Sequence, residues 1–249
     1  MNQEKLVDTV VKTGRLLIES GAEIYRVEET MVRICKSYPE VEVADSFVTA
    51  TGIMLSVKIQ GQTTTRIIRV RSKDVDLNVI DEINTLSREV CLNPLAVDEL
   101  VNRLDCIERG KRYSFWTTCF FGALGAGGFA ILFNGSVQDI VAAFIIGFLI
   151  RFFMEVLKQF KFNSFLINLI TAAFAAMMSF LFEGILSQSH SEITIISSIM
   201  LLVPGLAITN AIRDTVVGDY LSGLARATEA FVVAIAIAMG CGFMMRIMG

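Results

Sequence analysis

Long apolar stretches dominate the second half of this 249-residue chain. A helix needs about 20 largely apolar residues to cross the hydrocarbon core of a membrane. We expect membrane-spanning helices at five such stretches: 113–133, 137–157, 164–186, 193–212 and 224–245. The sequence therefore predicts an α-helical polytopic membrane protein with about five transmembrane helices.

Charged residues are concentrated before the first of these stretches. Residues 1–112 contain 16 Lys and Arg and 18 Asp and Glu, whereas residues 113–249 contain only 6 and 7. The second part has too little charge to cover a water-soluble surface, so we expect a transmembrane domain over 113–249. The first part can form a cytosolic domain over 1–112, and its near-neutral balance argues against nucleic acid as a partner.

The N-terminal 112 residues mix two periodicities. Apolar residues recur at helical spacing up to Pro39, and two further amphipathic helices are expected at 75–90 and 94–107. Between them, the β-branched segments 46–59 and 63–71 predict a β-hairpin. The cytosolic domain is therefore expected to have an α+β fold of helices plus a β-hairpin.

Lys and Arg residues fix the expected orientation, because cytoplasmic connections carry the excess of positive charge. Basic residues gather at every second connection: Lys111 and Arg112, then Arg151, Lys158 and Lys161, then Arg213 and Arg226. The connections at 134–138 and 187–192 have none, and Arg246 is the exception. The prediction is a multi-pass protein of the inner (plasma) membrane with a cytoplasmic N-terminus and an external C-terminus.

Metal or cofactor chemistry is not indicated. The sole histidine, His190, falls in an expected outer loop, and the five cysteines are scattered without a CxxC pair. We therefore expect no metal site and no cofactor.

The fourth expected span contains the densest polar cluster of the membrane half. Pro204 is the only proline after residue 112 and is followed by Gly205, so the helix should be kinked or broken there. Broken helices present partial charges and free backbone groups to substrates near the middle of the membrane. The predicted substrate-binding residues are Pro204, Gly205, Thr209, Asn210 and Arg213. The alternative is a structural kink in which Asn210 makes a helix–helix hydrogen bond.

The connection after this span is rich in charge. Asp214, Asp219, Arg226 and Glu229 are candidates for ion coupling or gating, because ionisable residues at a membrane are costly to retain. Arg226 and Glu229 are three residues apart on a helix and can form an ion pair. The alternative is a salt bridge at the cytoplasmic boundary that fixes topology.

The cytosolic half offers no catalytic constellation. Glu19, Glu23, Arg26 and Glu28 surround a helix break at Gly21, but residues 1–112 contain no histidine to act as general base. Charged helix faces exposed to water explain this pattern, so we do not expect an enzyme.

Three segments resemble the threonine/serine exporter family: 20–30, 47–53 and 203–230. The resemblance covers nearly the whole chain and implies export of small amino acids, or in some relatives a dicarboxylate, driven by an ion gradient. Fused family members carry a second bundle of about five spans. The resemblance therefore implies that this chain is the large subunit of a split two-component exporter with a second small membrane subunit.

The leading hypothesis is a secondary active, proton-coupled exporter subunit for small carboxylate-bearing metabolites, such as threonine, serine or succinate. Its expected partners are the small-molecule substrate, the lipid bilayer, and a second small membrane subunit or further copies of the chain. One alternative is a membrane-anchored regulatory or scaffold protein that acts through its cytosolic domain. A hydrolase is the other, and it lacks a convincing nucleophile–base pair.

Overall fold

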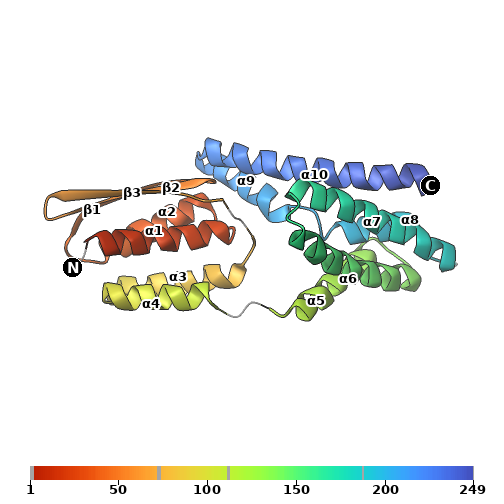
Figure 1. Cartoon of the computed structure of the whole chain (residues 1–249), viewed down its shortest axis with the longest axis horizontal. Helices are drawn as coiled ribbons and strands as arrows, with labels where there is room; N and C mark the ends of the chain where they lie inside the picture. Colours follow the sequence, from red (N-terminus) through yellow and green to blue (C-terminus); the bar gives the residue numbers. More distant parts are fainter. Residues whose placement is uncertain (1–2, 72–73, 111–112, 187, 249) are drawn as a thin grey trace. The chain divides into compact units, whose positions relative to one another are not determined.

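A computed structural model describes residues 3–71, 74–110, 113–186 and 188–248. These residues form ten helices and one three-stranded sheet (Figure 1). The chain divides into two compact units, each built from two segments. Unit 1 combines residues 1–111 with 206–227, and unit 2 combines 112–205 with 228–249. The expected domain boundary at 112 lies outside the described residues.

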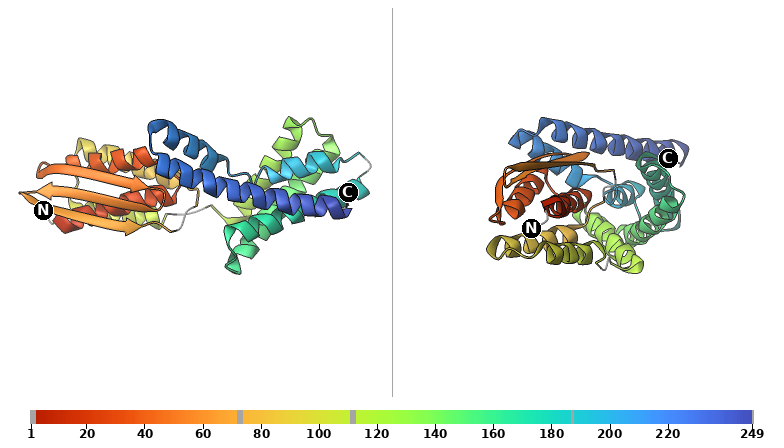
Figure 2. Two further views of the ribbon diagram at one scale, coloured as in Figure 1. Left: turned by 90° about the horizontal axis from the view of Figure 1, so that it is seen from above. Right: turned by 60° about the vertical axis from the view of Figure 1, so that its left-hand side comes forward.

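Unit 1 is built on an antiparallel sheet of β1 (Val41–Thr49), β2 (Gly52–Ile59) and β3 (Gln62–Arg69), in that order. Figure 2 shows these strands side by side, with helices behind one face. α1 (Gln3–Glu19) and α2 (Ile24–Lys36) pack on that face, and α3 (Leu77–Leu92) and α4 (Val97–Glu108) form the next layer. The core between the layers is apolar and includes Leu6, Leu17, Met31, Ile53 and Leu55.

The sheet has one strand more than the expected hairpin. The segment 46–59, predicted as one strand, turns at residues 50–51 and pairs with itself in register, Thr49 opposite Gly52. The Thr49 hydroxyl stabilises this turn by donating to the carbonyl of Gly52 at 3.3 Å. The turn was missed because β-branched residues, which favour strands, lie on both sides of it, and Gly52 is the only typical turn residue nearby.

Unit 2 consists mainly of long apolar helices. Four helices are long and apolar enough to cross a membrane: α5 (Phe115–Leu132), α6 (Val137–Gln159), α7 (Ser164–Ile185) and α10 (Tyr220–Met248). The first turns of α10, up to residue 227, belong to unit 1. α5 and α6 approach closely at Gly147, where a Cβ atom would lie 2.6 Å from the Cβ of Ala126. Large apolar side chains on the outer faces, such as Phe121 and Phe243, are exposed as expected for contact with lipid.

The expected fourth span, 193–212, is not one continuous helix. α8 (Ser191–Ile199) ends in unit 2, and α9 (Gly205–Val217) begins after residues 200–204. The break predicted at Pro204 is therefore confirmed. Among the described residues, four helices are long and apolar enough to cross a membrane by themselves, and the fourth expected span is divided between α8 and α9. Proline has no N–H for the preceding helical turn and clashes with it, which explains where the helix is interrupted.

Candidate functional site

The α1–α2 turn meets the α9–α10 hairpin inside unit 1. Gly21 adopts φ 90° in this turn, a left-handed conformation that glycine reaches without strain. Its carbonyl accepts a hydrogen bond of 3.0 Å from Nδ2 of Asn210 on α9. Asn210 is buried. Its side chain therefore joins two segments that are 189 residues apart in the sequence.

An ion pair forms the exposed side of this junction. Arg213 on α9 pairs with the carboxylate of Glu23, the residue just before α2. Arg26 approaches the same carboxylate at 3.3 Å. The Glu23 side chain is only 15% exposed, whereas that of Arg213 is 44% exposed. The guanidinium expected to bind a substrate carboxylate is thus held by a carboxylate of the protein.

A second ion pair lies deeper. Nε of Arg226 on α10 is 3.2 Å from Oδ2 of Asp214 on α9, and Asp214 is fully buried. Arg226 also donates to the carbonyl of Ala22 at 2.7 Å. The attraction between the two charges offsets the cost of removing each of them from water. Within the described chain, the Asp214 oxygens have no well-aligned hydrogen bond.

We call this set of residues the hub: Gly21, Ala22, Glu23, Ile24, Asn210, Arg213, Asp214 and Arg226. A third segment borders it through Glu28, whose carboxylate accepts a hydrogen bond of 2.7 Å from the N–H of Val48 on β1. Burial raises the pKa of Glu28, and the charge of Asp219 raises it further. Segments 20–30 and 47–53 and the central part of segment 203–230, residues 206–227, therefore all belong to unit 1.

Two expectations about the hub require correction. Glu23 and Glu28 are not simply solvated helix charges, because both carboxylates have protein partners and limited exposure. The helix–helix hydrogen bond considered for Asn210 is instead a bond to a turn carbonyl. Two features of the sequence could have found these partners: the glycine between the helices, Gly21, and the acidic residue two positions later, Glu23.

The remaining predicted site residues are divided between the units. Asp219 belongs to unit 1, as do Thr209, Asn210, Arg213, Asp214 and Arg226, whereas Pro204, Gly205 and Glu229 belong to unit 2. Thr209 is exposed on α9. Arg226, expected to pair with Glu229, contacts Asp214 and Ala22.

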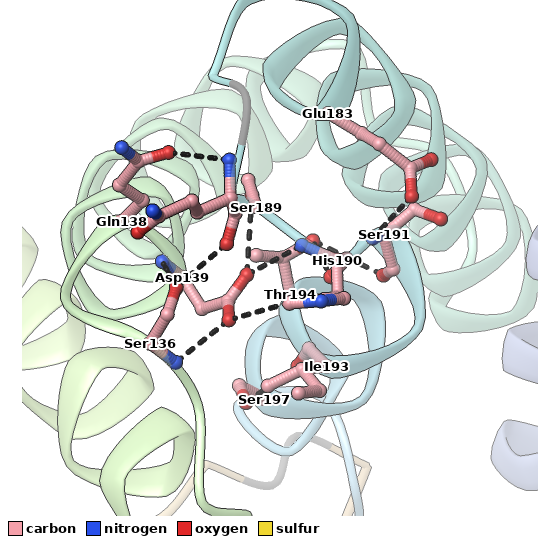
Figure 3. A network of polar contacts seen from close by, with 11 residues as sticks. Ser136, Gln138, Asp139, Glu183, Ser189, His190, Ser191, Ile193, Thr194 and Ser197 are labelled. Carbon is pink, nitrogen blue, oxygen red and sulfur yellow. Dashed lines mark hydrogen bonds and ion pairs between the residues drawn. The ribbon is translucent and has the colours of Figure 1, made fainter.

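A separate polar cluster closes one end of unit 2 (Figure 3). Asp139, fully buried at the start of α6, accepts hydrogen bonds from the backbone N–H of Ser136 at 2.8 Å and of His190 at 2.6 Å. The Ser189 hydroxyl and Nδ1 of His190 are each 3.2 Å from the same carboxylate. These bonds fasten the α7–α8 loop to the α5–α6 turn.

Across residues 3–71, 74–110, 113–186 and 188–248, no three His, Cys, Asp or Glu side chains gather as they would around a metal ion. The hub is an arrangement of hydrogen bonds and ion pairs.

Comparisons with known proteins match almost the full chain. A family described as "Putative threonine/serine exporter" matches residues 8–248. The "Probable succinate transporter subunit YjjP" of Escherichia coli (strain K12) is 24% identical over 99% of this chain and 96% of the relative. The YjjP of Klebsiella aerogenes is 23% identical over 99% of this chain and 95% of the relative.

A longer relative also aligns. The "Probable threonine/serine exporter" of Mycobacterium tuberculosis is 22% identical over 96% of this chain but only 46% of its own length. No solved structure matches the chain. With apolar helices long enough to span a bilayer and a family match over residues 8–248, this membrane protein belongs to the threonine/serine exporter family of transporters.

Proposed function

We propose that the protein is a subunit of a proton-coupled exporter in the cell membrane. Its substrates are small carboxylate-bearing metabolites, either threonine and serine or a dicarboxylate such as succinate. The names of the relatives support both substrate classes. The N-terminus is cytoplasmic and the C-terminus external in this proposal, which requires the broken segment from α8 to α9 to cross the membrane once.

The observation that carries the proposal is the ion pair between Arg213 and the carboxylate of Glu23. In this structure the Arg213 guanidinium is paired with Glu23, and the side chain of Asn210, on the same helix, donates to the carbonyl of Gly21. A substrate carboxylate has the same charge and geometry as Glu23, so it can take the place of Glu23 at Arg213. Substrate binding then releases the α1–α2 turn from α9. In this scheme the α1–α2 turn is the gate.

The start of α9 supplies further contacts in this scheme. Pro204 and Gly205 interrupt the helix, and Thr209 lies on the same helix as Asn210 and Arg213. The free N–H groups of a helix start favour a negatively charged group. The substrate carboxylate is therefore drawn along α9 towards Arg213.

Asp214 is the proposed proton carrier. It is fully buried, and a charged carboxylate away from water is costly unless it is paired. Proton uptake by Asp214 removes the charge that holds Arg226, which also binds the carbonyl of Ala22. Protonation therefore loosens the hub from a second side. Asp219 and Glu229 are further candidates for gating.

We also propose a second small membrane subunit. The YjjP relatives, which align along nearly their whole length, are named subunits, and the mycobacterial exporter is about twice as long as the aligned region. Further copies of this chain are the alternative partner.

Counterflow of labelled threonine, serine and succinate into proteoliposomes tests the proposal, with the chain alone and with a candidate small subunit. R213A should abolish counterflow while membrane insertion is retained. The matched control is R33A, because Arg33 pairs with Glu29 on the exposed face of α2. Equal counterflow in wild type, R213A and R33A would refute the substrate site.

A further inference from the structure

We propose a second binding site, inside unit 2, for a compact monovalent cation. The site is marked by the hydroxyl groups of Thr171 on α7 and Ser198 on α8. Its occupant is either a sodium ion or the ammonium group of an amino-acid substrate. The proposal rests on the proposed function for its transport readout only, since cation binding is measured independently.

Thr171 and Ser198 differ from the other hydroxyl residues around them. Both are fully buried, and neither oxygen has a hydrogen-bond partner within the described parts of the chain. A buried hydroxyl without a partner is destabilising, because it has lost its hydrogen bonds to water. Such a group in a native interior therefore calls for a ligand.

Neighbouring hydroxyls follow the ordinary pattern of helices. Ser197 donates to the carbonyl of Ile193 at 2.6 Å, and Ser179 donates to that of Ala175 at 3.0 Å. Thr194 donates to the carbonyl of Ser191 at 3.0 Å. Bonds of this kind satisfy a helical Ser or Thr locally. The orphan state of Thr171 and Ser198 is thus a local exception.

The two orphan hydroxyls belong to the same packed interior. Ser198 lies between Ile195 and Leu202 in the sequence, and these two residues pack in one cluster with Ala172 and Ala175. Thr171 directly precedes Ala172 and is one turn before Ala175.

The end of α8 determines the sign of the charge that is favoured. Ser198 lies in the last turn of α8, which ends at Ile199. Helix C-termini carry partial negative charge. Broken helices in transporters use such ends to hold sodium ions. In unit 2, the charged residue that is buried among those described is Asp139, which lies beside His190 at the opposite end of α8.

An anionic group is disfavoured at this position for the same reason. A substrate carboxylate would face the negative end of α8, and no buried Lys or Arg is present among the described residues of unit 2. Hydroxyl and carbonyl oxygens are suitable ligands for sodium and acceptors for an ammonium group. The chemistry shared by both occupants is a small cation surrounded by neutral oxygens.

Thermal unfolding of the purified full-length chain in detergent tests the site. The variants are T171V and S198A, with S197A as the matched control because its hydroxyl is buried and already satisfied. Each protein is melted in sodium chloride, in choline chloride, and in choline chloride with threonine or succinate. Removal of an orphan hydroxyl should leave the choline melting temperature unchanged or raised, so loss of folding does not confuse the result.

A sodium site predicts that sodium raises the wild-type and S197A melting temperatures by about 5 °C at saturation and that T171V and S198A lose the shift. An ammonium site predicts that threonine, and not sodium, raises the melting temperature of the wild type and S197A and that T171V and S198A lose this shift. Succinate has no ammonium group, so any shift it causes should be the same in all four proteins. The proposal is overturned if neither sodium nor threonine stabilises the wild type, or if T171V and S198A keep the full shift.

Counterflow separates this inference from the proposed function. Wild-type counterflow with unchanged activity in T171V and S198A overturns the cation site and leaves the exporter assignment intact. Absence of counterflow in the wild type, with sodium shifts as predicted, removes the exporter assignment and leaves the site intact.

Discussion

Two buried aspartates, one in each unit, have very different partners. Asp139 in unit 2 is bonded to two backbone N–H groups, a hydroxyl and an imidazole. Asp214 in unit 1 is equally buried but depends mainly on the ion pair with Arg226. The first carboxylate is held by permanent donors, so its role is structural. The second is held by a charge that can move or be cancelled, which suits a gate.

Of the changes that test this comparison, loss of Arg226 should have the largest effect on stability. R226A leaves the Asp214 carboxylate buried without its counter-charge, which we expect to destabilise unit 1 by about 3–5 kcal/mol. The double variant R226A/D214N should recover most of that loss, because a neutral amide replaces the isolated charge. Limited proteolysis and thermal unfolding of both variants measure the recovery. Additive losses in the double variant would contradict the pairing.

Removal of Asp139 should be next in size and should affect stability without affecting transport. D139A deletes the acceptor of four donors and is expected to destabilise the protein by about 1–3 kcal/mol. Counterflow per folded molecule should stay at the wild-type level. A selective loss of counterflow at normal melting temperature would show that the Asp139 cluster is more than a structural fastening.

Removal of the Glu23 carboxylate should have a smaller effect, and it should improve substrate binding. E23Q weakens the competitor for Arg213, and a partly exposed ion pair contributes about 0.2–1 kcal/mol. The apparent KM for substrate should therefore fall by roughly 1.5- to 5-fold. An increased KM would mean that Glu23 assists substrate binding and does not compete with it.

The smallest expected effect is a change in pH dependence. Burial raises the pKa of Glu28 above its ordinary value of 4.5, so the folded state binds this proton more tightly than the unfolded state. Stability from Glu28 is present below pH 4.5 and declines as the pH rises from 4.5 through the raised pKa. E28Q should remove this decline in melting temperature. An unchanged pH profile in E28Q would contradict the assignment.

The sequence predicted the broad architecture and the helix break. Long apolar stretches specify α5, α6, α7 and α10 by composition alone, and Pro204 specifies the interruption after α8. Both signals are local, because they depend on solubility in lipid and on one missing N–H.

The hub partners could not be predicted in the same way. Glu23 and Arg213 are 190 residues apart, and nothing local in either helix indicates the ion pair. Their pairing depends on tertiary packing that places the α9–α10 hairpin in unit 1. The orphan hydroxyls of Thr171 and Ser198 were also beyond sequence reasoning, since a Ser or Thr in a helix usually satisfies itself.

The most direct test of the account is a charge exchange between Glu23 and Arg213, measured by counterflow of labelled threonine and succinate. E23R/R213E restores an ion pair of the same two groups and should therefore recover the melting temperature lost in R213E. Counterflow should stay abolished in the double variant, because α9 then offers a carboxylate where the substrate needs a guanidinium. Recovery of wild-type counterflow in E23R/R213E would contradict the account, since Arg213 would then serve only to hold the α1–α2 turn.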